Sequence, residues 1–132
     1  MLIVTTLIAC ILAALFVYLS FAVIRLRRHH KVGLGNGGVD DLERAIRAQG
    51  NFVEYVPIAL ILLACLELND APLWLTAIPG IALVTGRLIH AKGINQPPPH
   101  FTNRIIGMRF TITTLIMLVV FNLVWLLLQL WS

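Results

Sequence analysis

Charged residues and cysteines are scarce in this sequence. Only 12% of its 132 residues are charged, whereas a soluble domain has roughly a quarter. The two cysteines, Cys10 and Cys65, both lie inside apolar stretches, and a disulfide framework needs more cysteines in a polar, loop-rich chain. The histidines show no metal-ligand spacing with cysteine or carboxylate. These absences argue against a soluble domain, a disulfide-rich domain and a metal site.

The N-terminal segment also lacks the basic residues with which a signal peptide begins. Its apolar run, from about residue 2 to residue 24, is longer than the hydrophobic region of a signal peptide, which has about 7–15 residues. We therefore expect this segment to be a retained membrane helix.

Hydrophobic residues make up 59% of the sequence and form four long runs. A membrane-spanning helix needs about 20 mostly apolar residues. The runs therefore predict spans at about 2–24, 44–68, 73–90 and 110–131. The predicted fold is an all-α integral membrane protein, with one four-helix bundle over residues 1–132. The first, third and fourth spans are expected to carry no internal charge and to form lipid-facing or packing surfaces.

The connections between the spans differ in kind. Asp40 and Asp41 precede the second span, where carboxylates are expected to cap the free amides of a helix start. Asn69, Asp70 and Pro72 predict a short turn before the third span. The third connection contains three consecutive prolines, which forbid helix.

The ten basic residues lie in or beside the first and third connections. They are Arg25, Arg27, Arg28, Lys31, Arg44, Arg47, Arg87, Lys92, Arg104 and Arg109. With four spans, these two connections share one side of the membrane, and the positive-inside rule places them in the cytoplasm with both termini outside. This orientation explains the positive charge, so no nucleic-acid partner is expected. Membrane lipid is an expected partner.

The second span begins with a stripe of polar residues. Arg47, Asn51 and Glu54 are four and three residues apart, so they share one helical face. Arg44 and Tyr55 extend this face, while Gln49 points elsewhere. The stripe is expected to face a protein interior or crevice, since a charge near hydrocarbon needs a partner or a purpose. An internal ion pair between Arg47 and Glu54, which only holds the bundle together, is the alternative.

The polar stripe resembles the second-helix signature of the MAPEG family, the membrane-associated proteins of eicosanoid and glutathione metabolism. The resemblance lies in Glu43-Arg44-x-x-Arg47-Ala48-Gln49-x-Asn51-x-x-Glu54-Tyr55-x-Pro57. It extends to the four spans, the chain length and the basic end of the first span. The short chain and the glycine-rich first connection are most similar to the small bacterial, YecN-like branch, which implies the bacterial inner membrane.

The resemblance implies a homotrimer that binds glutathione, as a co-substrate, between neighbouring subunits near the cytosolic face. Arg47 is then expected to bind a glutathione carboxylate, and Glu54 the ammonium group. Asn51 and Tyr55 are expected to bond the peptide portion. Arg28, at the end of the first span, is expected to line the same site.

The family further implies that glutathione thiolate attacks a small hydrophobic electrophile or a lipid hydroperoxide. Arg104 and Arg109, at the start of the fourth span, are the candidates for stabilising the thiolate. Well-known enzymes of the family carry tyrosines near the end of the third span, where this chain has His90 and Ile94. His90 is a possible hydrogen-bond donor to the ligand, whereas Ile94 is not.

Two alternatives remain open from the sequence. One is a non-catalytic MAPEG protein that binds a lipid or thiol without turnover, which the isoleucine at position 94 favours. The other is a small proton-coupled multidrug transporter. Such a transporter places its essential carboxylate in the first span, and the first span here has none.

Overall fold

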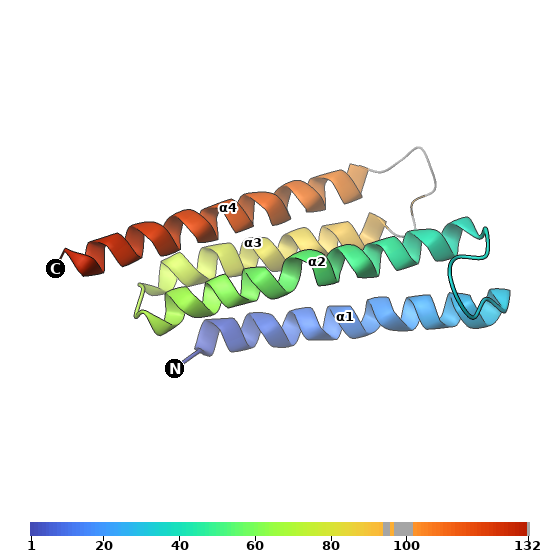
Figure 1. The fold of residues 1–132 in the computed structure, drawn as a ribbon, viewed down its shortest axis with the longest axis horizontal. Coiled ribbons are helices and arrows are strands. Elements are labelled where there is room, and N and C mark those ends of the chain that lie inside the picture. The colour runs from blue at the N-terminus through green and yellow to red at the C-terminus, as the bar shows by residue number, and fades with distance from the viewer. Residues whose placement is uncertain (94–95, 97–101, 132) are drawn as a thin grey trace.

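The computed structural model describes residues 1–93, 96 and 102–131, which form four helices (Figure 1). They are α1 (Ile3–His30), α2 (Asp40–Leu68), α3 (Leu73–Lys92) and α4 (Thr102–Leu130). Each of these helices is long and apolar enough to cross a membrane. The structure therefore confirms the predicted all-α membrane fold with four spans.

The helices extend further than the apolar runs from which the spans were predicted. α1 continues to His30, α2 begins at Asp40, and α4 begins at Thr102. A hydropathy pattern marks only the part of a helix that lies in hydrocarbon, and the helical backbone continues into polar residues beyond it. As a result Arg25, Arg27 and Arg28 lie inside α1, and Arg104 and Arg109 lie inside α4. Arg87 lies within the predicted third span itself, so the prediction that this span carries no internal charge is wrong.

The two aspartates at the start of α2 lie inside its first turn, and Val39 is the residue at the N-cap. Oδ1 of Asp41 accepts a hydrogen bond from the Leu42 amide, which is one of the free amides of the first turn, as predicted. Oδ2 of Asp41 lies 3.2 Å from Nε2 of His30. Asp41 thus bonds a free amide of α2 and also connects the start of α2 to the end of α1.

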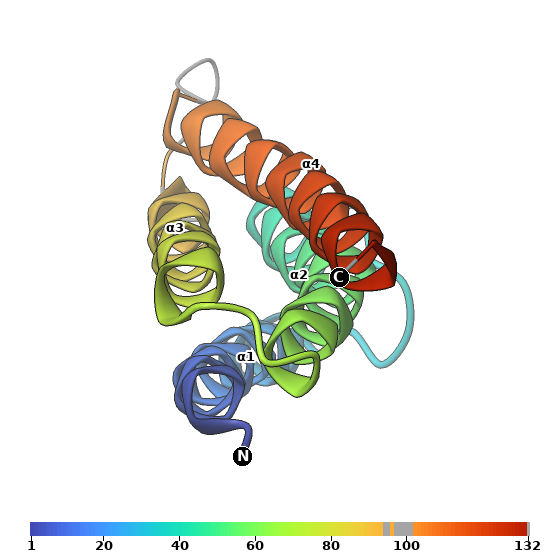
Figure 2. The same ribbon diagram turned by 90° about the vertical axis from the view of Figure 1, so that its left-hand side faces the viewer.

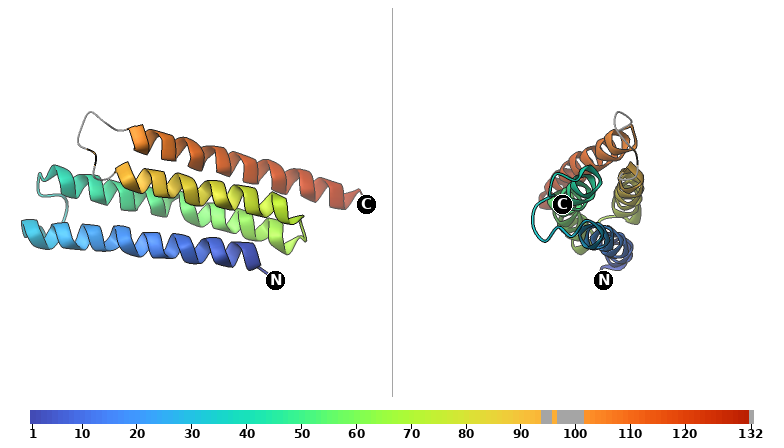
Figure 3. Two further views of the ribbon diagram at one scale, coloured as in Figure 1. Left: turned by 180° about the vertical axis from the view of Figure 1, so that it is seen from behind. Right: turned by 90° about the vertical axis from the view of Figure 1, so that its right-hand side faces the viewer.

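The four helices lie side by side, with α2 and α3 between α1 and α4 (Figure 2). Both termini lie at the end of the bundle where α2 connects to α3, and the α1–α2 connection lies at the opposite end (Figures 1 and 3). The described basic residues gather towards that opposite end. Buried leucines from all four helices form the main core: Leu12, Leu19, Leu63, Leu83 and Leu118.

α3 packs most extensively against α4, and two glycines allow the close contact. A Cβ atom on Gly107 would lie 2.6 Å from the carbonyl oxygen of Gly86 and 2.6 Å from the amide nitrogen of His90. Because both neighbours are main-chain atoms, no side-chain rotation can make room. Small residues let membrane helices approach closely in this way. This contact lies beside the residues that form the candidate site.

Glu67 stabilises the end of the bundle where α2 connects to α3 and where both termini lie. Its two carboxylate oxygens each accept a hydrogen bond of 2.8 Å, from the amides of Val4 and Thr5. These amides belong to the first turn of α1, where backbone donors have no partner within the helix. α1 has no acidic residue in its own first turn. The last turn of α2 therefore supplies the negative charge that the N-terminus of α1 favours.

Candidate functional site

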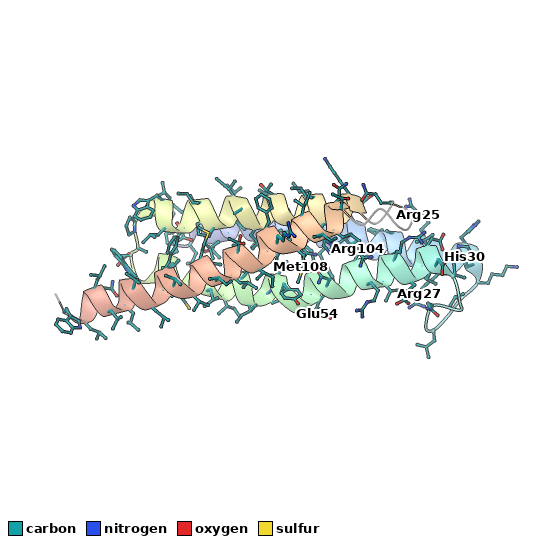
Figure 4. All side chains as sticks on the ribbon, turned by 90° about the horizontal axis from the view of Figure 1, so that it is seen from above. Arg25, Arg27, His30, Glu54, Arg104 and Met108 are labelled. Atoms are coloured by element: carbon teal, nitrogen blue, oxygen red, sulfur yellow. The ribbon has the colours of Figure 1, made fainter. Side chains whose placement is uncertain are left out.

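The polar stripe of α2 lines a crevice that faces the beginning of α4. The crevice has a volume of about 160 Å³ and is lined by Ile46, Arg47, Gly50, Asn51, Glu54 and Arg104. Figure 4 shows Glu54 on α2 and Arg104 on α4 in the same part of the bundle. Gln49 points away from this crevice, as predicted, and its amide donates a hydrogen bond of 2.9 Å to Ser20 on α1.

Arg47 and Glu54 do not form an ion pair with each other. Among the described residues, the ion pair within 4.0 Å is His30–Asp41. The side chains of Arg47 and Glu54 are exposed, and Asn51 between them is half-buried. The single chain thus leaves a cation and a carboxylate open at the crevice, so the alternative of a sealed Arg47–Glu54 pair does not describe this structure.

A second pocket adjoins the crevice on the side of α3. It is lined by Asn51, His90, Arg104, Ile105 and Met108. Asn51 and Arg104 line both hollows, so the two are continuous along α2 and α4. Met108 lies one turn along α4 from Arg104 (Figure 4). The crevice offers charges of both signs, whereas the second pocket offers a cation, an amide, an imidazole and apolar walls.

Arg87 stands behind the second pocket and was not identified from the sequence. Its side chain is 1% exposed. Its Nη1 donates a hydrogen bond of 2.8 Å to Oδ1 of Asn51, and its Nη2 lies 3.4 Å from Nδ1 of His90. The sequence signal that could have identified it is the three-residue spacing of Arg87 and His90, which places both on one face of α3. The sequence analysis assigned Arg87 to a flank of the third connection, where an arginine would extend towards water.

Other predicted site residues lie elsewhere in the single chain. Arg28 lines a separate pocket at the end of α1, together with Arg27 and Lys31. Tyr55 is half-buried and Arg109 is exposed, and neither lines the crevice or the second pocket. Ile94 lies outside the described residues. The structure therefore brings together Arg47, Asn51, Glu54, His90 and Arg104.

Comparison with known proteins assigns the family. The model of the MAPEG family matches residues 5–128. The inner membrane protein YecN of Escherichia coli (strain K12) is 42% identical over 120 residues, which cover 91% of this chain and 90% of that protein. YecN of Escherichia coli O6:H1 (strain CFT073) gives the same identity and coverage. With a family match over nearly its whole length and these relatives, the chain belongs to the MAPEG family.

Proposed function

We propose that this protein binds glutathione in the inner membrane and activates its thiol for attack on a hydrophobic electrophile or a lipid hydroperoxide. The observation that carries the proposal is the crevice, in which Arg47 and Glu54 are open to a guest and do not pair with each other. Membership in the MAPEG family and the similarity to inner membrane proteins support it.

The charges of the crevice match those of glutathione, which has two carboxylates and one ammonium group. A planar guanidinium binds a carboxylate through two parallel hydrogen bonds, and this favours Arg47 for one end of the tripeptide. Glu54 accepts the ammonium group. Asn51 lies between them and supplies an amide for the central, cysteine portion of the tripeptide. The guest supplies the opposite charges that both side chains need at the edge of the membrane.

The proposal places a second subunit next to this crevice. Arg28 lies with Arg27 and Lys31 at the end of α1, in a pocket separate from the crevice. In a homotrimer, Arg28 of one subunit would complete the site of its neighbour. Tyr55 and Arg109 would take part from the same interface. The basic end of the bundle would face the cytoplasm, where positively charged connections are retained.

Activation of the thiol requires positive charge, because the thiolate is the nucleophile. Arg104 is the cation that lines both the crevice and the second pocket. The thiolate would lie near Arg104, and the second substrate would enter from the bilayer. His90 takes the place of one aromatic donor found in related enzymes.

Binding is tested by thermal unfolding of the detergent-solubilised protein with millimolar glutathione. A ligand at 100 times its Kd stabilises the folded state by about 2.7 kcal/mol, so the wild type should melt at a higher temperature. We expect the Arg47→Ala and Glu54→Ala variants to lose most of this shift. Lys92→Ala is the matched control, because it removes an exposed cation that lines neither hollow. No shift in the wild type, or an equal shift in all variants, would refute the assignment.

Turnover is tested separately by conjugation of glutathione to an aryl halide and by reduction of a lipid hydroperoxide. An enzyme raises the rate above that of the uncatalysed reaction, and Arg104→Ala should remove most of the increase. A protein that binds glutathione in the thermal assay but accelerates neither reaction is a binding protein without turnover.

A further inference from the structure

Arg87 is a buried cation without a carboxylate partner. Among the described residues, no carboxylate lies within ion-pair distance of it, and its Nε atom is buried without a hydrogen-bond partner. Its Cζ atom lies 5.3 Å from the ring centroid of Phe52, a distance at which a cation is attracted to an aromatic face. A buried charge without a counter-ion costs several kcal/mol. The position of Arg87 therefore calls for an explanation beyond helix packing.

Arg87 fixes the orientation of the Asn51 side chain. A guanidinium donates hydrogen bonds and accepts none, so the Asn51 atom 2.8 Å from Nη1 must be the oxygen. The amide nitrogen of Asn51 is thereby turned towards α4, where it lies 3.6 Å from Sδ of Met108. A thioether sulfur is a weak acceptor. Asn51 consequently has N–H groups to offer to a guest in the second pocket.

The contact with Arg87 also favours one tautomer of His90. Nη2 of Arg87 lies 3.4 Å from Nδ1 of His90, and because a guanidinium only donates, this contact favours Nδ1 as the acceptor. The neutral ring then carries its proton on Nε2. In that tautomer, Nε2 is the N–H donor that His90 can offer to a guest in the second pocket, which it lines.

We propose that Arg87 is a positioning residue, which holds Asn51 and His90 with their N–H groups towards the second pocket, where they bind the thiolate of the tripeptide. This inference rests on the proposed function. Among the described residues, the polar lining of this pocket consists of the donors Asn51, His90 and Arg104, with no carboxylate, and this suits an anion. Its walls of Ile105 and Met108 suit a sulfur better than a hydrated carboxylate. The charged ends of the tripeptide stay in the adjoining crevice.

The first test needs no ligand. NMR of protein labelled with ¹⁵N-histidine distinguishes the two neutral tautomers, and the His90→Gln variant assigns the signal. We expect the wild type to carry its proton on Nε2. Arg87→Met should give a mixture of tautomers, because methionine has no hydrogen-bond donor. Arg87→Lys should also give a mixture, because a single ammonium group lacks the planar fork whose two ends reach Asn51 and His90. A proton on Nδ1 in the wild type, or an unchanged tautomer in the variants, overturns the proposal. Should Arg87→Met not fold, Arg87→Lys decides.

The second test compares glutathione with S-methylglutathione, which has the same charged ends but no ionisable thiol. The wild type should prefer glutathione, and Arg87→Lys should reduce this preference roughly tenfold, as expected for a weakened hydrogen bond to a charged group. An equal loss for both ligands would mean that Arg87 only supports the fold, and would overturn the proposal. If the wild type binds neither ligand, the proposed function fails, and the tautomer alone then shows whether Arg87 positions His90.

Discussion

Glu67 and Arg87 are two charged side chains inside the helices of this bundle, and they are accommodated differently. The carboxylate of Glu67 has two backbone amides as donors, which replace the water that a carboxylate loses on burial. Arg87 has an amide oxygen, an imidazole nitrogen and an aromatic face instead. The first arrangement is complete within one chain. In the second, no carboxylate of the described residues lies within ion-pair distance of the guanidinium.

Removal of the Glu67 charge is expected to destabilise the protein. Hydrogen bonds to a charged group contribute roughly 1.5–3 kcal/mol, so Glu67→Gln should lower the free energy of unfolding by about 1–2 kcal/mol. The measurement is reversible unfolding in mixed micelles. Asp70→Asn is the control, since it removes one exposed negative charge at the same end, and asparagine tolerates the positive φ of 52° at this position. An equal effect of the two substitutions would contradict a specific role for Glu67.

At the scale of the helices, the contact between α3 and α4 determines where the candidate site lies. Gly86 and Gly107 bring the two backbones together. His90 follows Gly86 by four residues on α3, and Arg104 precedes Gly107 by three residues on α4. Residues at these spacings share a helical face. The close contact thus places an imidazole and a guanidinium on opposite walls of one pocket.

Gly107→Ala is expected to separate α3 from α4, because its Cβ would lie 2.6 Å from main-chain atoms of Gly86 and His90. We expect a loss of stability of about 1–3 kcal/mol, as is typical of overpacking, together with weaker glutathione binding. Gly50→Ala is the control for stability: a Cβ there meets nothing within 4 Å, and alanine is the better helix former. The measurement is the free energy of unfolding of both variants and of the wild type. Equal stability of Gly107→Ala and wild type would argue against the close contact of α3 and α4.

The sequence predicted the four helices and the family, because long apolar runs and a fifteen-residue polar motif are local signals. It did not predict the burial of Arg87. An arginine near the end of an apolar run can extend to water or turn inward, and only the packing of α2 against α3 decides between them. The helix ends were also misplaced, since a hydropathy pattern marks the segment that lies in hydrocarbon and not the full extent of the hydrogen-bonded helix. Arg28 and Arg47 were expected in the same site but line different pockets of the single chain, a separation that local sequence cannot show.

At the scale of the whole molecule, the outer faces of α1 and α4 are largely apolar and exposed. In a membrane these faces contact lipid or other subunits. The described basic residues lie in the parts of the helices nearer the α1–α2 connection, and Figure 4 shows Arg25 and Arg27 at that end of the bundle. This polarity gives the molecule one preferred orientation.

The orientation is checked by labelling single cysteines with a membrane-impermeant reagent, after Cys10 and Cys65 have been replaced by alanine. Leu34→Cys lies in the α1–α2 connection and is expected to react only after the inner membrane has been permeabilised. Asn69→Cys lies in the α2–α3 connection and should react in intact cells stripped of their outer membrane. The reverse pattern would contradict the proposed topology.

The oligomeric state is tested by the mass of the protein in detergent. A homotrimer is expected to have three times the chain mass of 14.7 kDa.

The glycine contact between α3 and α4 has a consequence for ligand affinity. A pocket wall held by main-chain atoms has no rotamers to lose when a guest arrives, unlike a wall held by interlocking side chains. The Gly86–Gly107 contact thus preorganises the wall of the pocket between His90 and Met108, and this lowers the entropic cost of ordering the protein around any guest that enters it.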